Sequence, residues 1–276
     1  MTHSDWIGRA REARDLITPR LEAEFRATFD RTLDEVQGGV PGAPGLHWCL
    51  SPEIWPPHDL GRDGHPKTGL FLPDLGLPRR MWAGGKLRFR GALAVGEEVV
   101  RRSRIADISF KEGRSGRLGF VTVELDYAVA GETRIEEIQT IVYRDDPGAG
   151  AKQPAPPPAP QWEPVRRVEI ETTPTLLFRY SAITFNGHRI HYDPAYATRV
   201  EGYGGLVVHG PMQSTWMQHM ATSLLGRLPA DFSYRGLSPL ICGRPAAVEA
   251  RRDGDALSLR VRDLEGDFVT MEATAR

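Results

Sequence analysis

The chain has 276 residues, 40% of them hydrophobic and 26% charged, with a formal net charge of -1 at pH 7. This composition is typical of a globular protein and offers no basic surface for nucleic acid. Two cysteines are too few for a disulfide framework. The sequence shows no signal peptide, and no apolar run approaches the roughly 20 residues that cross a bilayer. We therefore expect a cytoplasmic protein without membrane segments.

Two stretches, residues 18–30 and 173–186, begin alike and diverge later. Each opens with Thr-Pro, a hydroxyl cap followed by proline, which predicts the start of a helix. In the first stretch apolar residues recur every four positions, as on one face of a helix: Leu21, Phe25, Phe29 and Leu33. The repeat predicts an internally duplicated chain.

The segment after the first helix is irregular. Residues 38–78 are rich in Gly, Pro and aromatic side chains, which predicts a long loop that covers a site or an interface. Gly76 and Pro78 interrupt the place where this half would carry a central helix. We therefore expect that helix to be incomplete and to leave space in the first half.

The remaining pattern predicts strands, a linker and one buried helix. Residues 86–144 alternate with period two between Gly-containing turns, as in an antiparallel meander. The second half has a helix that is apolar around most of its circumference, residues 212–225, and then strands. We expect those strands at residues 237–241, 246–251, 256–262 and 268–274. The expected organisation is α+β, with an amino-terminal half over residues 1–145, a Pro-rich linker over 146–164 and a carboxy-terminal half over 165–276.

Common catalytic motifs are absent from the sequence. It contains no GxGxxG, GxxxxGK[ST], HExxH or GxSxG, so nucleotide, zincin and serine-hydrolase chemistry have no support. Histidines remain, and three of them with one carboxylate could ligate zinc: His188, His191, His209 and Asp193. The alternative is that they are hydrogen-bonded structural histidines.

Three segments resemble a known family. Residues 186–193 (Asn-Gly-His-Arg-Ile-His-Tyr-Asp) and 201–211, which end in His-Gly-Pro, resemble the hydratase-2 motif of MaoC-like enoyl-thioester hydratases and dehydratases. Residues 77–84 resemble the branch that holds 3-hydroxyacyl-thioester dehydratase and mesaconyl-C4-CoA hydratase. The resemblance implies a double hotdog: two antiparallel sheets, each curled around a central helix, with the helix incomplete in the amino-terminal half.

The resemblance also implies catalytic roles. The family motif is Asp, four residues, then His, and here Asn186 stands at the acid and His191 at the histidine. An amide cannot accept a proton, so Asn186 could only orient water or substrate, and His191 must carry both proton steps. The N–H of Gly210, at the start of the apolar helix, would polarise the thioester carbonyl. Asp193 could assist His191, although a cap for the next turn is the favoured interpretation.

Further residues are expected to bind substrate: His188, Arg189, Tyr203, His209, Arg79 and Arg80. The arginines could hold coenzyme A phosphates or a substrate carboxylate, or could simply be solvated. No metal and no cofactor is expected, because coenzyme A is part of the substrate.

The leading functional hypothesis is a hydro-lyase that hydrates a 2-enoyl-CoA or dehydrates a 3-hydroxyacyl-CoA, with mesaconyl-C4-CoA as the best single substrate. The alternatives are a 3-hydroxyacyl-thioester dehydratase acting on CoA or acyl carrier protein, an acyl-CoA thioesterase, and a non-catalytic acyl-thioester binding module. A homodimer is expected because strand edges of hotdog sheets commonly pair.

Overall fold

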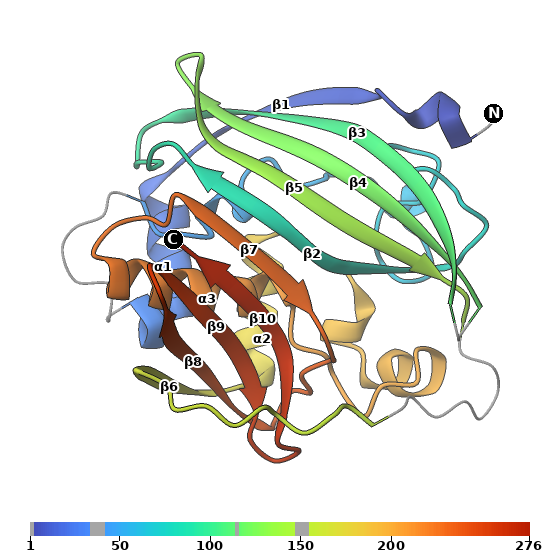
Figure 1. The fold of residues 1–276 in the computed structure, drawn as a ribbon. Coiled ribbons are helices and arrows are strands. Elements are labelled where there is room, and N and C mark those ends of the chain that lie inside the picture. Colours follow the sequence, from blue (N-terminus) through green and yellow to red (C-terminus); the bar gives the residue numbers. More distant parts are fainter. Residues whose placement is uncertain (1–2, 34–41, 114–115, 147–154) are drawn as a thin grey trace.

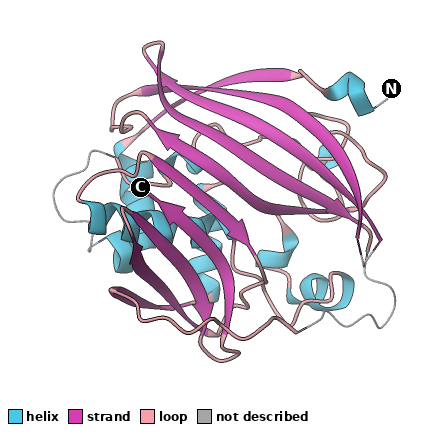
Figure 2. Ribbon diagram, in the orientation of Figure 1, coloured by secondary structure: helices cyan, strands magenta, loops and turns pink. Residues whose placement is uncertain are grey.

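The computed structural model describes residues 3–33, 42–113, 116–146 and 155–276, so residues 38–41 of the expected loop, 114–115 of an expected turn and 147–154 of the expected linker lie outside it. Figure 2 shows a large sheet with fewer helices. The first half contains β1 (Ala10–Leu16), α1 (Pro19–Leu33), β2 (Arg79–Phe89), β3 (Glu98–Gly113), β4 (Gly116–Val129) and β5 (Glu132–Arg144). The second contains β6 (Arg166–Glu171), α2 (Pro174–Ile183), α3 (Gly210–Leu225), β7 (Asp231–Gly236), β8 (Pro245–Asp253), β9 (Ala256–Asp263) and β10 (Phe268–Ala275).

All the strands form one antiparallel sheet in the order β1-β3-β4-β5-β2-β7-β10-β9-β8-β6 (Figure 1). From one edge to the junction the order is β1-β3-β4-β5-β2, and from the other edge it is β6-β8-β9-β10-β7. The first to fifth strands of each half therefore occupy the same positions, as expected for a duplicated chain. The two halves join where β2 pairs with β7, from Gly84 opposite Arg235 to Arg88 opposite Asp231. At this β2–β7 junction a Cβ on Gly85 would lie 2.4 Å from the Tyr234 hydroxyl, so the close approach requires glycine.

The repeated Thr-Pro segments begin helices in the same way. The Thr18 hydroxyl accepts a hydrogen bond from the Leu21 N–H, and the Thr173 hydroxyl accepts one from the Leu176 N–H, both at 3.1 Å. The helices α1 and α2 contact each other, and Phe29 meets Tyr180 edge to face with ring centroids 5.7 Å apart. The two expected helix starts are therefore confirmed.

Within the described ranges, the central helix is present in the second half and absent from the first. In the second half α3 packs against β7, β8, β9 and β10 (Figure 1). Its Met212, Trp216 and Met217 are buried. In the first half, residues 42–78 contain short 3₁₀ turns and no α-helix. Side chains fill the space that was expected in place of this helix. Leu46 begins the turn Leu46–Cys49, Leu50 follows it, and both are almost completely buried.

One expected strand was wrong. Residues 237–241 are not a strand; the strand is β7, over Asp231–Gly236, where Phe232 and Tyr234 alternate inward. Leu237 is instead 43% exposed, because the chain leaves the sheet there. Strand β1 was also missed, because its charged, half-exposed alternation marks an edge strand and gives a weak apolar signal.

A buried carboxylate organises the interior beside the junction. Glu137 on β5 accepts hydrogen bonds from Trp48 Nε1 (3.0 and 3.1 Å), Gln139 Nε2 (2.9 Å), the Tyr234 hydroxyl (3.2 Å) and the Tyr127 hydroxyl (3.4 Å). Burial raises the pKa of Glu137. This Glu137 cluster joins the first-half loop to β4, β5 and β7.

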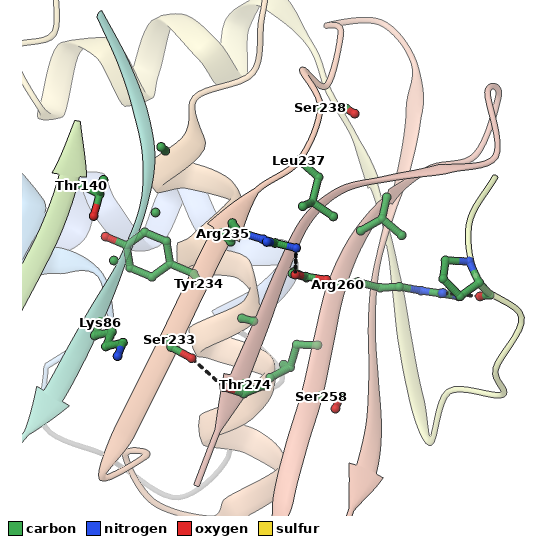
Figure 3. Close-up of a pocket in the computed structure, with 18 of the residues that line it drawn as sticks. Lys86, Thr140, Ser233, Tyr234, Arg235, Leu237, Ser238, Ser258, Arg260 and Thr274 are labelled. Carbon is green, nitrogen blue, oxygen red and sulfur yellow. Dashed lines mark hydrogen bonds and ion pairs between the residues drawn. The ribbon is translucent and has the colours of Figure 1, made fainter. Parts of the chain in front are cut away.

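The described part of the expected linker, residues 155–164, lies along the outer face of the second-half strands. The Trp162 ring lies under the Arg260 guanidinium at 4.0 Å, and Ala159 N–H donates to Asp267 O at 2.7 Å. A groove of about 1230 Å³ separates this segment from β2 and β7, and Figure 3 shows Arg235 and Leu237 among its lining residues. None of the sequence-predicted site residues lines this groove. Within the described residues we find no helix that is both long enough and apolar enough to cross a membrane.

Candidate active site

His191 ends a short 3₁₀ turn, Arg189–His191, in the loop between α2 and α3. Its Nδ1 lies 2.6 Å from the carbonyl oxygen of Val207. A carbonyl can only accept, so Nδ1 carries the proton of the neutral ring and Nε2 is left with the lone pair. This backbone contact therefore fixes the tautomer in which Nε2 is the basic nitrogen.

His191 lies directly at the start of α3. Its ring stacks on that of His209, with centroids 3.5 Å apart and an interplanar angle of 18°. His209 immediately precedes α3, and its Nε2 lies 2.9 Å from the Ser181 hydroxyl. Burial lowers the pKa of both imidazoles well below 6.5. His188 further disfavours protonation of His191, and His191 further disfavours protonation of His209. Both rings are neutral at pH 7, while His191 keeps 7% of its surface exposed.

Gly210 is the first residue of α3 and is partly exposed. The first N–H groups of a helix have no intrahelical acceptor, so this end can donate to a developing anion. A Cβ at Gly210 would lie 2.7 Å from Cε3 and 3.1 Å from Cζ3 of Trp82, on β2 of the other half. The absence of a side chain lets Trp82 pack against the start of α3.

We expect Gly210→Ala to lower kcat/KM by roughly 10²-fold, because the new methyl group displaces the α3 start, and to lower stability by about 1 to 3 kcal/mol. Gly204→Ala is the matched control, since its Cβ would meet Ile241 only at 4.0 Å. Steady-state kinetics and thermal unfolding compare the two variants. Equal behaviour of both would contradict the close packing at Gly210.

Asn186 and Asp193 both hold the backbone of the loop. The Asn186 side-chain oxygen accepts from the His188 N–H at 2.9 Å, which shapes the turn that leads to His191. One Asp193 oxygen accepts from the Tyr196 N–H at 3.0 Å, and the other binds Arg189 at 2.7 Å. The cap interpretation of Asp193 is confirmed, and the four-residue zinc alternative loses its carboxylate to these contacts.

Sequence reasoning missed two residues of the first-half loop, Asp63 and His65. Gly64, at φ 87°, brings them to the motif: a Cβ there would lie 2.0 Å from Gly187 O. The Arg189 N–H donates to Asp63 O at 2.8 Å. The rings of His65 and His188 then lie with centroids 4.1 Å apart. The Asp-Gly-His turn within a covering loop is the signal that could have found them.

The three candidate arginines each meet a carboxylate. Arg79 is buried, lies 2.5 Å from Glu201 and sits over the Tyr203 ring. Arg189 pairs with Asp193. Arg80 makes a longer contact, 3.3 Å to Asp63. Because Asp63 also contacts His65 at 3.1 Å, Arg80 is the candidate arginine that lies beside the histidines. Burial raises the pKa of Tyr203, so its hydroxyl stays protonated at neutral pH.

Comparisons with known proteins identify the family and the fold. A family model described as hydroxyacyl-thioester dehydratase type 2 matches residues 45–242. The chain is 38% identical over 261 residues to mesaconyl-C(4)-CoA hydratase of Chloroflexus aurantiacus, covering 95% of this chain and 93% of that protein. A MaoC-like dehydratase from Phytophthora capsici superposes with a TM-score of 0.72 at 17% identity, over 99% of this chain and 97% of that one.

A Mycobacterium tuberculosis protein described as having a double hotdog fold superposes with a TM-score of 0.56 at 14% identity, over 98% and 95% of the two chains. These likenesses confirm the expected α+β double hotdog, with the addition that the sheets of the two halves are continuous.

Proposed function

We propose that this chain, which belongs to the hydroxyacyl-thioester dehydratase type 2 family, is a hydro-lyase that adds water to a 2-enoyl-CoA or removes it from a 3-hydroxyacyl-CoA. The observation that carries the proposal is the His191 imidazole, fixed by Val207 O with Nε2 as its basic nitrogen and stacked against the residue that precedes α3. This contact and this stacking support a role for His191 as the base and for the start of α3 as the donor to the anion.

In the hydration direction, His191 Nε2 takes a proton from water while the water oxygen bonds to C3. The C2–C3 π electrons move toward the thioester, and the resulting negative charge on its oxygen is stabilised by the Gly210 N–H. The imidazolium then returns its proton to C2, so the proton balance closes on one nitrogen. Dehydration reverses these steps. Asn186 supports the base by holding the His188 amide of the same turn.

The proposed substrate is a short branched dicarboxylic acyl-CoA such as mesaconyl-C4-CoA. The name of the 38% identical relative supports this choice. Arg80 supports it as well, because its long contact with Asp63 leaves guanidinium donors for a second carboxylate beside the histidines. The alternative is an unbranched monoacyl thioester on CoA or acyl carrier protein, which the family name favours.

Loss of enoyl-thioester absorbance on a panel of CoA esters tests the proposal. We expect turnover of mesaconyl-C4-CoA above that of crotonyl-CoA, and we expect Arg80→Gln to raise KM for the dicarboxylic substrate by about 10-fold or more. Arg88→Gln, at an exposed ion pair, is the control. Release of free thiol without hydration would instead indicate a thioesterase, and binding without turnover would indicate a binding module.

The pH dependence of kcat/KM tests the state of the base. Neutral His191 is the active form, and burial lowers its pKa, so we expect activity to stay constant from pH 8 to below 6.5 before it falls. Neutral buried histidines also stabilise the fold above pH 6.5 and lose that contribution as the pH falls. Circular dichroism at each pH separates the two effects. An acid limb centred at 6.5 or above in folded protein would contradict a desolvated base.

From the sequence, we propose that the protein is a cytoplasmic homodimer. We also propose that it accepts substrates carried on acyl carrier protein as well as on CoA. Light scattering after size exclusion measures the oligomeric state. Among the described strands, β1 and β6 are the edges of the sheet and are rich in charged side chains, so contact between two chains through a face is favoured over edge pairing.

A further inference from the structure

We propose that Asp63, His65 and His188 form a binding site for a divalent transition-metal ion, with Zn²⁺ as the expected occupant, and that the bound ion inhibits the enzyme. One ligand atom from each of these residues lies within 4.8 Å of the other two. The site differs from the histidine and Asp193 set considered from the sequence. It is built where the first-half loop meets the motif loop, and the Gly64 and Gly187 backbones hold the two together.

The distances are close to those of a coordinated ion. Zn²⁺ binds nitrogen and oxygen at about 2.0 to 2.2 Å, so tetrahedral ligand atoms lie roughly 3.3 to 3.5 Å apart. Asp63 Oδ2 and His65 Nδ1 are already 3.1 Å apart. Among the described residues, no hydrogen bond partner is found for the ring nitrogens of His188. Its ligand atom lies within 4.8 Å of the other two, so coordination requires this ring to move closer to them.

Charge and access also fit a cation. Asp63 supplies the one carboxylate among the three ligands, and its side chain is 8% exposed. Its 3.3 Å contact with Arg80 is longer than the roughly 2.7 to 2.9 Å of a strong charge-assisted bond, which leaves carboxylate lone pairs for an ion. The His65 side chain is 30% exposed, which gives a path from solvent.

The ligand types select the metal. Two imidazoles and one carboxylate suit Zn²⁺, Ni²⁺ or Cu²⁺, whereas Mg²⁺ prefers oxygen ligands and retains its waters. With three protein ligands, one coordination position stays open for water. We therefore expect stoichiometric binding of Zn²⁺ and none of Mg²⁺ at comparable concentration.

Inhibition follows from the position of the site. The ring centroids of His188 and His191 are 5.3 Å apart. A dication on His188 opposes the positive charge that His191 acquires when it takes a proton from water. It also locks the His188 ring against His65. Both effects act on the proposed base.

Calorimetric titration of the metal-stripped chain with ZnCl₂, without substrate, tests binding independently of activity. We expect one equivalent to bind, and we expect His65→Ala and His65→Gln each to weaken affinity at least about 100-fold. The control His58→Ala removes an exposed histidine and should leave affinity unchanged. Circular dichroism confirms that each variant is folded.

The activity arm uses the same variants. Zn²⁺ should inhibit wild type and a chelator should restore it, whereas added Zn²⁺ should leave the activity of His65→Ala at the level that this variant has without the ion. Binding that survives both His65 variants, or equal affinity for Mg²⁺, overturns the site, and stoichiometric binding without inhibition overturns the inhibitory role. Absence of hydratase activity would contradict the proposed function, while the calorimetric titration would still show whether the metal site exists.

Discussion

His191→Asn is expected to lower kcat/KM for hydration by about 10³ to 10⁴-fold, the upper range for a single general acid–base group, because one nitrogen carries both proton transfers. Asparagine can still donate to Val207 O, the contact that His191 makes through Nδ1 at 2.6 Å. The fold should therefore survive while the base is lost. Steady-state kinetics on mesaconyl-C4-CoA measures the effect.

The matched control is His58→Asn, the same substitution at an exposed histidine of the first-half loop. It should leave kcat/KM within about twofold of wild type, since surface substitutions are nearly neutral. Thermal unfolding of both variants checks that they fold. If folded His191→Asn kept activity within tenfold of wild type, the imidazole would have no part in proton transfer, and the chemistry would need another base.

Glu137→Leu is expected to destabilise the protein by about 3 kcal/mol or more. The carboxylate accepts from Trp48, Tyr234 and Tyr127, and the leucine leaves these donors buried without an acceptor, at roughly 1 to 3 kcal/mol each. For a chain of this size each kcal/mol corresponds to roughly 2 to 4 °C in Tm. We therefore expect Tm to fall by roughly 6 to 12 °C in a calorimetric or fluorescence scan.

Glu136→Leu provides the comparison, because it changes the next residue on the same strand. The Glu136 side chain is 43% exposed and pairs with Arg88 and Arg90, contacts worth about 0 to 1 kcal/mol. Its variant should unfold within about 2 °C of wild type. Similar losses from both variants would mean that the Glu137 cluster contributes no more than a surface ion pair.

Local signals in the sequence predicted much of this fold. The caps at Thr18 and Thr173 and the apolar surface of α3 depend on neighbouring residues, so periodicity and capping chemistry locate them. The proximity of His191 to the start of α3 followed from the family resemblance. The structure adds the cause, which is the stacked His209 ring.

Contacts between distant segments could not be predicted in this way. The pairing of β2 with β7 spans about half the chain and depends on small residues at Gly84 and Gly85, which carry no apolar pattern. Asp63 reaches the motif loop only because Gly64 and Gly187 pack backbone to backbone. The ion pairs of Arg79 and Arg80 are likewise set by tertiary packing, and a lone arginine in a sequence does not reveal its partner.

The junction between β2 and β7 has a stoichiometric consequence. Both repeats belong to one polypeptide, so each could acquire substitutions that the other lacks. Among the described residues, the loop that carries His191 belongs to the second repeat alone. A tight-binding transition-state analogue should therefore titrate at one molecule per 276 residues.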